Sequence, residues 1–223
     1  MNGTMIISSD YGIGTKYKLI IDERIVNTTN PETNKYLKDY ENKKILVIDD
    51  NKQTGLIFTK YLKNNHIAID TAYTGRETLN KIKDKNKYDL IIVDSSDPFG
   101  PSEGLFTREF YGNCYNALKA DGIMVNQQGS PFYSEDAHAM QRSHKRIAST
   151  FQISRVYQAH IPTFAAGYWL FGFASKKYHP VDDLDPEAWN ALNLRTRYYT
   201  TRLHRGAFYL PAFLEEMLQE VED

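Results

Sequence analysis

One stretch constrains the fold of this chain more than any other: YDLIIVDSSDPFGPSEGLF, from Tyr88 to Phe106. It begins with a continuous apolar run, which is typical of a strand buried on both faces of a parallel sheet. The run ends at two carboxylates, Asp94 and Asp97, and a loop rich in Pro and Gly follows. Because ligands of open α/β sheets bind outside the carboxyl ends of the strands, this stretch predicts both a fold class and the location of a site.

The remainder of the chain after residue 43 predicts alternating strands and helices. Apolar runs and alternating patterns predict strands at Ile45–Ile48, Ile67–Tyr73, Leu90–Val93, Ile123–Asn126, Ile153–His160 and Tyr168–Ala174. Helical spacing predicts helices at Lys52–Asn64, Gly75–Lys85, Thr107–Leu118, Glu135–Phe151, Pro186–Leu192 and Pro211–Leu218. Such alternation gives right-handed βαβ units. We therefore expect a three-layer α/β fold around a mostly parallel, Rossmann-like sheet, with the first strand central and the first, third and fourth adjacent, parallel and buried on both faces.

The sequence also predicts where the chain divides. Residues 1–43 are expected to form a strand and a polar linker, because YGIGTKYKLII reads as a turn into a strand and TTNPET interrupts the charged stretch after it. Residues 44–223 are expected to form a single α/β domain. Within that domain, residues 44–94 and residues 95–223 are expected to be two different halves.

Composition excludes several classes of protein. The 223 residues carry a formal net charge of −1, so no large basic field predicts binding to nucleic acid or to an anionic membrane. No apolar run reaches the length of a membrane span, and no signal-peptide pattern opens the chain. The single cysteine, Cys114, excludes an intrachain disulfide. A cytoplasmic protein is the expectation.

Four acids follow predicted strands that should be neighbours. Asp49, Asp50, Asp94 and Asp97 all fall at carboxyl ends, where they could bind a magnesium ion, bind a cationic substrate, or merely cap loops and helices. If they share one site, like-charge repulsion should raise the pKa of at least one of them. Asp94 is expected to face a cleft with another acid close by.

Two families resemble different parts of the chain. The residues KKILVIDDNKQTG and YDLIIVD are similar to the first and third strands of response-regulator receiver domains, and the segment before them resembles the end of a sensor histidine kinase. This resemblance covers residues 1 to about 94. It implies Asp49 and Asp50 as Mg²⁺ ligands, together with Asp94 as a phosphoacceptor. The resemblance ends there, since no receiver-like hydroxyl residue or lysine follows the later strands.

The second resemblance is longer. The residues DSSDPFGPSEGLFTREFY, GIMVNQQGSPFY, AHIPTFAAGYWLFGFASK and RYYTTRLHRGAFYLPAFLEEML resemble polyamine aminopropyltransferases, the spermidine synthase family, over about 88–218. Together the two resemblances imply a receiver-like half, residues 44–94, joined to a methyltransferase-like, synthase-like half, residues 95–223. The second resemblance implies transfer of an aminopropyl group from decarboxylated S-adenosylmethionine to putrescine or a similar diamine. The resemblance implies Asp94 as the catalytic proton acceptor and Pro101 beside the nucleoside. The implied diamine-binding residues are Asp94, Ser95, Ser96, Asp97, Gln127 and Phe164.

The chain departs from that family at several points. Asp49-Asp50-Asn51-Lys52 stands where the family has a glycine-rich nucleotide loop, and Phe164 stands where it has a tyrosine. We expect no counterpart of the family's amino-terminal β-domain, which helps its members to oligomerise. We therefore expect impaired or absent transfer, and whether the chain is an enzyme stays open. The alternatives are a Mg²⁺-binding receiver remnant of a phosphorelay and an inactive chimera, natural or constructed; a homodimer is compatible with each.

Overall fold

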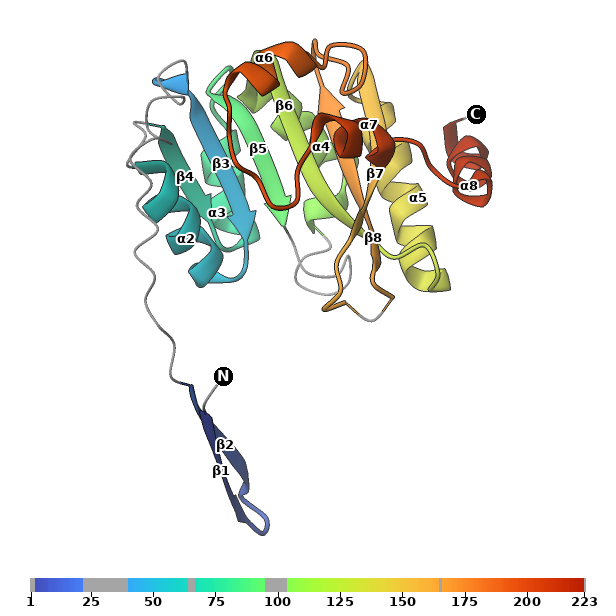
Figure 1. Ribbon diagram of the computed structural model, residues 1–223. Helices are drawn as coiled ribbons and strands as arrows, with labels where there is room; N and C mark the ends of the chain where they lie inside the picture. Colours follow the sequence, from blue (N-terminus) through green and yellow to red (C-terminus); the bar gives the residue numbers. More distant parts are fainter. Residues whose placement is uncertain (1–2, 22–39, 64–66, 95–103, 165, 223) are drawn as a thin grey trace. The chain divides into compact units, whose positions relative to one another are not determined.

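The structure is a computed structural model that describes residues 3–21, 40–63, 67–94, 104–164 and 166–222. The chain separates into two compact units, Met1–Glu32 and Thr33–Asp223. In the first unit, β1 (Gly3–Asp10) and β2 (Gly14–Ile21) pair as an antiparallel hairpin (Figure 1). The sequence predicted the turn and the second strand of this hairpin but not the first strand.

The second unit is built on a six-stranded sheet with the order β4-β3-β5-β6-β8-β7 (Figure 1). Its strands are β3 (Lys44–Asp49), β4 (Ala68–Ala72), β5 (Tyr88–Asp94), β6 (Leu118–Gly129), β7 (Ile153–His160) and β8 (Tyr168–Ser175). The pairs β3–β4, β3–β5 and β5–β6 are parallel, whereas β8 is antiparallel to β6 and β7. The prediction of an α/β fold with a mostly parallel sheet is confirmed.

Helices cover the sheet on both faces. Those between strands are α2 (Lys52–Lys63), α3 (Gly75–Ile82), α4 (Arg108–Ala117) and α5 (Ser134–Ala148). The chain moves outward from β3 to β4 and then back across to β5, so right-handed crossovers place α2 and α3 on opposite faces. The crossovers from β5 to β6 and from β6 to β7 run in the same direction as the one from β4 to β5. Helices α4 and α5 therefore lie on the same face of the sheet as α3 (Figure 1). Three terminal helices follow: α6 (Pro186–Ala191), α7 (Thr201–Ala207) and α8 (Ala212–Glu222).

The main core lies between the sheet and α3, α4 and α5. Leu46, Ile91 and Met124 point into it from three adjacent strands, and none of them is exposed. A second cluster joins α5, β7, β8 and α8 around Met140 and Leu214. These two clusters fix the strands that carry the candidate site residues.

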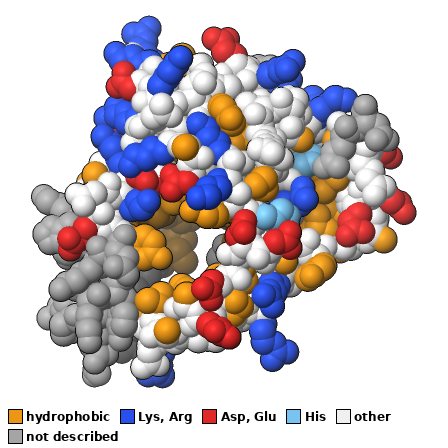
Figure 2. Space-filling view, turned by 90° about the horizontal axis from the view of Figure 1, so that it is seen from above, with side chains coloured by type: hydrophobic (Ala, Val, Ile, Leu, Met, Phe, Trp, Pro, Cys, Tyr) orange, Lys and Arg blue, Asp and Glu red, His pale blue; other side chains and the backbone are white. Residues whose placement is uncertain are grey.

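The opposite face of the sheet is less well covered. The side chains of Leu90, Ile92, Ile123 and Val125 alternate with the core residues and are only half-buried. The expected adjacency and parallel order of β3, β5 and β6 are confirmed, but burial on both faces is wrong for this side. The reason is that α2 lies over β3 and β4, and α7 contacts β7, which leaves the strip between them partly open. Figure 2 views the molecule from the amino-terminal edge of these strands and shows hydrophobic side chains around a hollow.

Two boundaries differ from the sequence prediction in ways that bear on the site. The segment Ala120-Asp121-Gly122 was predicted to end a helix, but it lies inside β6, as an irregularity between the pairs Tyr88↔Leu118 and Leu90↔Ile123. Helix α4 ends earlier, because Leu118 already has extended backbone angles. Helix α7 was not predicted at all. In the part of the chain that the structure describes, no helix is both long and apolar enough to cross a bilayer.

Candidate functional site

Polar side chains gather at the carboxyl ends of three neighbouring strands. Asp49 ends β3 and Asp94 ends β5, and the two residues are direct partners in the parallel ladder. Val93 pairs with Asn126 of β6, so Gln127 lies one position beyond, level with Asp94. Partners in parallel strands point to the same face. Asp49, Asp94 and Gln127 therefore share the face of the sheet that is half-covered.

The carboxyl group of Asp94 is electrostatically strained. Its pKa is raised above the usual value, first because burial disfavours the charged form and then because Asp49 and Asp50 lie close by. Much of the side chain nevertheless remains open to solvent. The nearness of Asp49 and Asp50 agrees with the predicted like-charge neighbourhood, although burial contributes more to the shift in pKa. A carboxylate with a raised pKa is a better proton acceptor than a free aspartate, which is what a general base needs.

Asp49 and Asp50 differ in environment. Asp49 is 6% exposed, and its Oδ1 accepts a hydrogen bond of 2.7 Å from the backbone N–H of Asn51. The Oδ1 of Asn51 in turn accepts from the N–H of Gln53 at 2.9 Å, so the turn into α2 is closed by its own side chains. Asp50 is exposed. Among the described residues, no group of three or more His, Cys, Asp or Glu side chains is placed to hold a metal ion.

Phe164 lies in the connection between β7 and β8. This antiparallel hairpin was predicted from the sequence, and Figure 1 shows its turn at the edge of the sheet where β3 and β5 end. The ring of Phe164 is partly exposed and makes an edge-on contact with Trp169, with ring centroids 4.5 Å apart. Ser95, Ser96, Asp97 and Pro101, the other predicted site residues, lie outside the described residues.

Residues that the sequence analysis missed adjoin Gln127 in β6. Asn126 and Gln128 are 3% and 6% exposed, and their side chains point to the core face rather than to the site face. The run of three amides at 126–128 was the available signal, because consecutive polar residues cannot all face solvent on a strand buried on one face. Gly172 of β8 packs directly against both amides.

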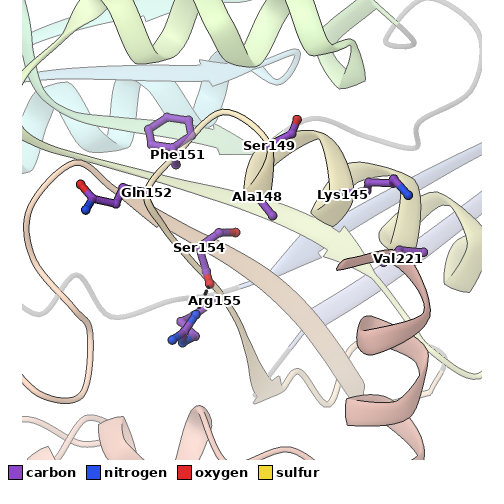
Figure 3. Close-up of a pocket in the computed structure, with 8 residues that line it drawn as sticks. All are labelled: Lys145, Ala148, Ser149, Phe151, Gln152, Ser154, Arg155 and Val221. Atoms are coloured by element: carbon purple, nitrogen blue, oxygen red, sulfur yellow. Dashed lines mark hydrogen bonds between the residues drawn. The ribbon is translucent and has the colours of Figure 1, made fainter. Parts of the chain in front are cut away.

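Two cavities lie away from the carboxylates. One, of about 360 Å³, lies where α5 ends and β7 begins; Figure 3 shows that its charged residues, Lys145 and Arg155, point away from each other. The other, of about 610 Å³, lies over the amino-terminal ends of the strands, with Ile45, Leu90 and Ile123 on its floor. Neither cavity is lined by a predicted site residue, so neither is the cleft expected at Asp94. The candidate site rests instead on the convergence of Asp49, Asp94 and Gln127 at the carboxyl ends of β3, β5 and β6.

The comparisons with known proteins agree on one family. The model of the spermine/spermidine synthase domain matches residues 57–185. A polyamine aminopropyltransferase of Alkaliphilus oremlandii is 63% identical over 139 residues, which is 62% of this chain and 49% of the relative. One of Clostridium beijerinckii is 62% identical over 143 residues, which is 64% of this chain and 50% of the relative.

Solved structures show the same likeness. A spermidine synthase crystallised with the transition-state analogue AdoDATO superposes with a TM-score of 0.67 at 27% identity, covering 97% of this chain and 85% of that one. A spermidine synthase of Thermotoga maritima superposes with a TM-score of 0.65 at 27% identity, covering 97% of this chain and 84% of that one. The chain belongs to the spermine/spermidine synthase family, and it spans about half the length of the curated relatives that it matches.

Proposed function

We propose that this member of the spermine/spermidine synthase family carries an aminopropyltransferase site centred on Asp94. The observation that supports this most strongly is the convergence of Asp49, Asp94 and Gln127 on one face at three strand ends, with the pKa of Asp94 raised. The co-substrates are decarboxylated S-adenosylmethionine and a diamine such as putrescine. The diamine is held by Asp94, Ser95, Ser96, Asp97, Gln127 and Phe164, and Pro101 lies against the nucleoside.

The proposed reaction needs one base and a leaving group. The amine must lose a proton before its lone pair can attack the carbon beside the sulfonium sulfur. The new C–N bond then forms as the C–S bond breaks, and methylthioadenosine leaves as a neutral thioether. Asp94 takes the proton, and acid–base assistance of this kind contributes about 10²–10⁴-fold. The partly desolvated Asp94 suits this role because it binds the proton more tightly than a free carboxylate does.

We further propose that transfer is impaired. The turn Asp49–Asn51 is closed by side chains, and α2 begins immediately afterwards at Lys52. Close approach of backbone to a nucleotide usually requires glycines, which this turn lacks. Methylthioadenosine should therefore bind only in the millimolar range or more weakly, about −4 kcal/mol. The proposed division of the chain is into residues 1–43 and 44–223, with a change of character after residue 94.

The test is product formation from putrescine and decarboxylated S-adenosylmethionine. Asp94→Asn should reduce any activity to background, since the amide cannot accept the proton. Phe164→Tyr should raise activity by restoring the hydroxyl that the family has. Asp84→Asn is the matched control, because Asp84 pairs with Lys87 at 3.2 Å on the surface, outside the candidate site. Full activity in Asp94→Asn would sink the assignment of the base.

A second candidate is the Mg²⁺-binding receiver remnant. The pairing of Asp49 with Asp94 favours it, whereas the described carboxylates Asp49, Asp50 and Asp94 do not form a group placed to hold a metal ion. Carboxylates and water are the ligands that Mg²⁺ prefers. Calorimetric titration with MgCl₂ separates the two proposals: binding that is lost in Asp49→Asn and Asp50→Asn, with no transfer in any variant, would favour the receiver remnant. An inactive chimera predicts neither binding nor transfer.

A further inference from the structure

Strand β6 ends in an irregularity directly beside the candidate site. Gln127 pairs with Phe171 of β8, and Gly129 pairs with Leu170. Gln128 is therefore an extra residue in β6 without a partner residue in the ladder with β8. Such a β-bulge bends the strand and redirects the side chains beside it. Gly129 has a φ of +92°, a value that residues with a Cβ rarely adopt, so the sequence supports the distortion at this point.

Two buried amides meet the neighbouring strand at this bulge. A Cβ added at Gly172 would overlap Oδ1 of Asn126 and Nε2 of Gln128, so both amides would have to shift to admit a side chain there. Within the described residues, Oδ1 of Asn126 and both amide atoms of Gln128 have no hydrogen-bond partner. Buried polar groups without partners are costly, and they require an explanation other than stability.

Asn126 also holds the backbone of Gln127. Nδ2 of Asn126 donates a hydrogen bond of 3.3 Å to the carbonyl oxygen of Gln127. Asn126 and Gln128 are buried on the core face, whereas the half-buried Gln127 lies on the opposite face, level with Asp94. The bulge therefore determines where the amide of Gln127 stands relative to the carboxylates.

We infer that Asn126, Gln128 and Gly172 form a positioning unit that sets the place of Gln127 in the diamine site. Gln128 touches no substrate in this scheme; as the extra residue of the bulge, it acts through the backbone that it shares with Gln127. The consequence for binding rests on the proposed function, whereas the consequence for the geometry of Gln127 does not. A purely structural role would leave both the environment of Gln127 and the affinity for a diamine unchanged.

The experiment compares the wild-type chain with Gln128→Leu, which removes the buried amide at nearly constant volume. In ¹⁵N-correlated NMR spectra, the side-chain amide signals of Gln127 should move; its backbone signal is not counted, because any substitution at residue 128 shifts it. In calorimetric titrations, putrescine should bind about tenfold more weakly, the worth of one misplaced hydrogen bond. Affinity for methylthioadenosine should stay the same. Thermal stability should not fall, since an amide without a partner has been removed.

Gln141→Leu is the matched control. Gln141 is also buried, but its Nε2 donates to the carbonyl of Met217 in α8 at 2.7 Å, so its loss should lower stability and leave the Gln127 signals in place. The inference would be overturned if the side-chain signals of Gln127 moved no more in Gln128→Leu than in Gln141→Leu. It would also be overturned if the wild-type chain bound putrescine and Gln128→Leu bound it equally well. If the wild-type chain binds no diamine, the proposed function fails, and the NMR comparison still decides whether Gln128 positions Gln127.

Discussion

Stability and chemistry oppose each other at Asp94. A folded-state pKa above the unfolded value means that the folded chain holds the proton more tightly, so the ionised carboxylate costs stability. That cost begins as pH rises through the unfolded value, near 4, and is complete above the folded value. A base that must be ionised while it is partly desolvated therefore lowers the free energy of unfolding at neutral pH.

We therefore predict that Asp94→Asn stabilises the chain at neutral pH. The amide resembles the protonated acid, so the gain in melting temperature should be largest at pH 7 and should shrink towards zero as pH falls below about 4. Scanning calorimetry of both proteins across this range tests the sign. A variant that is less stable than the wild type at pH 7 would show that the carboxylate makes favourable contacts that outweigh its desolvation.

The close packing at Gly172 gives a second prediction for a single residue. Gly172→Ala should destabilise by about 1–3 kcal/mol, because the methyl group would overlap two amides that are held in a buried place. Gly112→Ala is the matched control: it lies in α4 with nothing within 4 Å of the added Cβ, and should stabilise by up to about 1 kcal/mol. Urea unfolding of the two variants should give opposite signs.

Among the elements, α7 and the residue after it attach the carboxyl-terminal segment to the sheet. Nε2 of His204 donates to the carbonyl of Pro180 at 2.8 Å, and its Nδ1 lies 3.0 Å from the hydroxyl of Tyr199. The ring of Phe208 packs on Tyr157 of β7, with centroids 5.2 Å apart, and on Phe173 of β8, at 6.1 Å. These contacts cover part of the face that carries the candidate site.

Phe208→Ala should loosen this segment. Loss of the ring should cost about 3 kcal/mol or somewhat less, because Phe208 is only half-buried, and hydrogen exchange of the α7 amides should quicken. Tyr209→Ala is the matched control, since its side chain is exposed and its carbonyl, which accepts from Gln158, is retained. Equal exchange in the two variants would contradict the proposed role of the ring.

At the scale of the whole molecule, the two faces of the sheet should contribute unequally to stability. Ile91 points into the core and is fully buried, whereas its neighbour Ile92 lies on the half-covered face. Ile91→Ala should cost about 2–5 kcal/mol, and Ile92→Ala roughly half as much. Denaturant unfolding measures both. Equal costs would show that the second face is as well packed as the first.

Charge is also distributed unevenly across the molecule. At the amino-terminal edge of the sheet, Asp89 bridges Lys43 and Lys119 at 3.1 and 2.7 Å, and Asp70 bridges Lys44 and Lys81 at 3.1 and 3.5 Å. At the carboxyl edge, Asp49, Asp50 and Asp94 repel one another. The four lysines at the first edge are therefore paired with acids, whereas like charges surround Asp94 at the edge proposed to receive a diamine cation.

The sequence alone determined the strand–helix alternation, the place of β3 between β4 and β5 and the gathering of acids at the strand ends, because these follow from local periodicity and from the handedness of crossovers. The prediction that this first strand is central in the sheet is wrong, since β3 is second from the edge. Asp94 was identifiable from its place after a buried strand, and Gln127 from the family resemblance. Tertiary structure decided the rest. The half-covered face, the bulge at Gln128 and the fit of Gly172 against two amides depend on residues distant in sequence, whose packing no local pattern encodes.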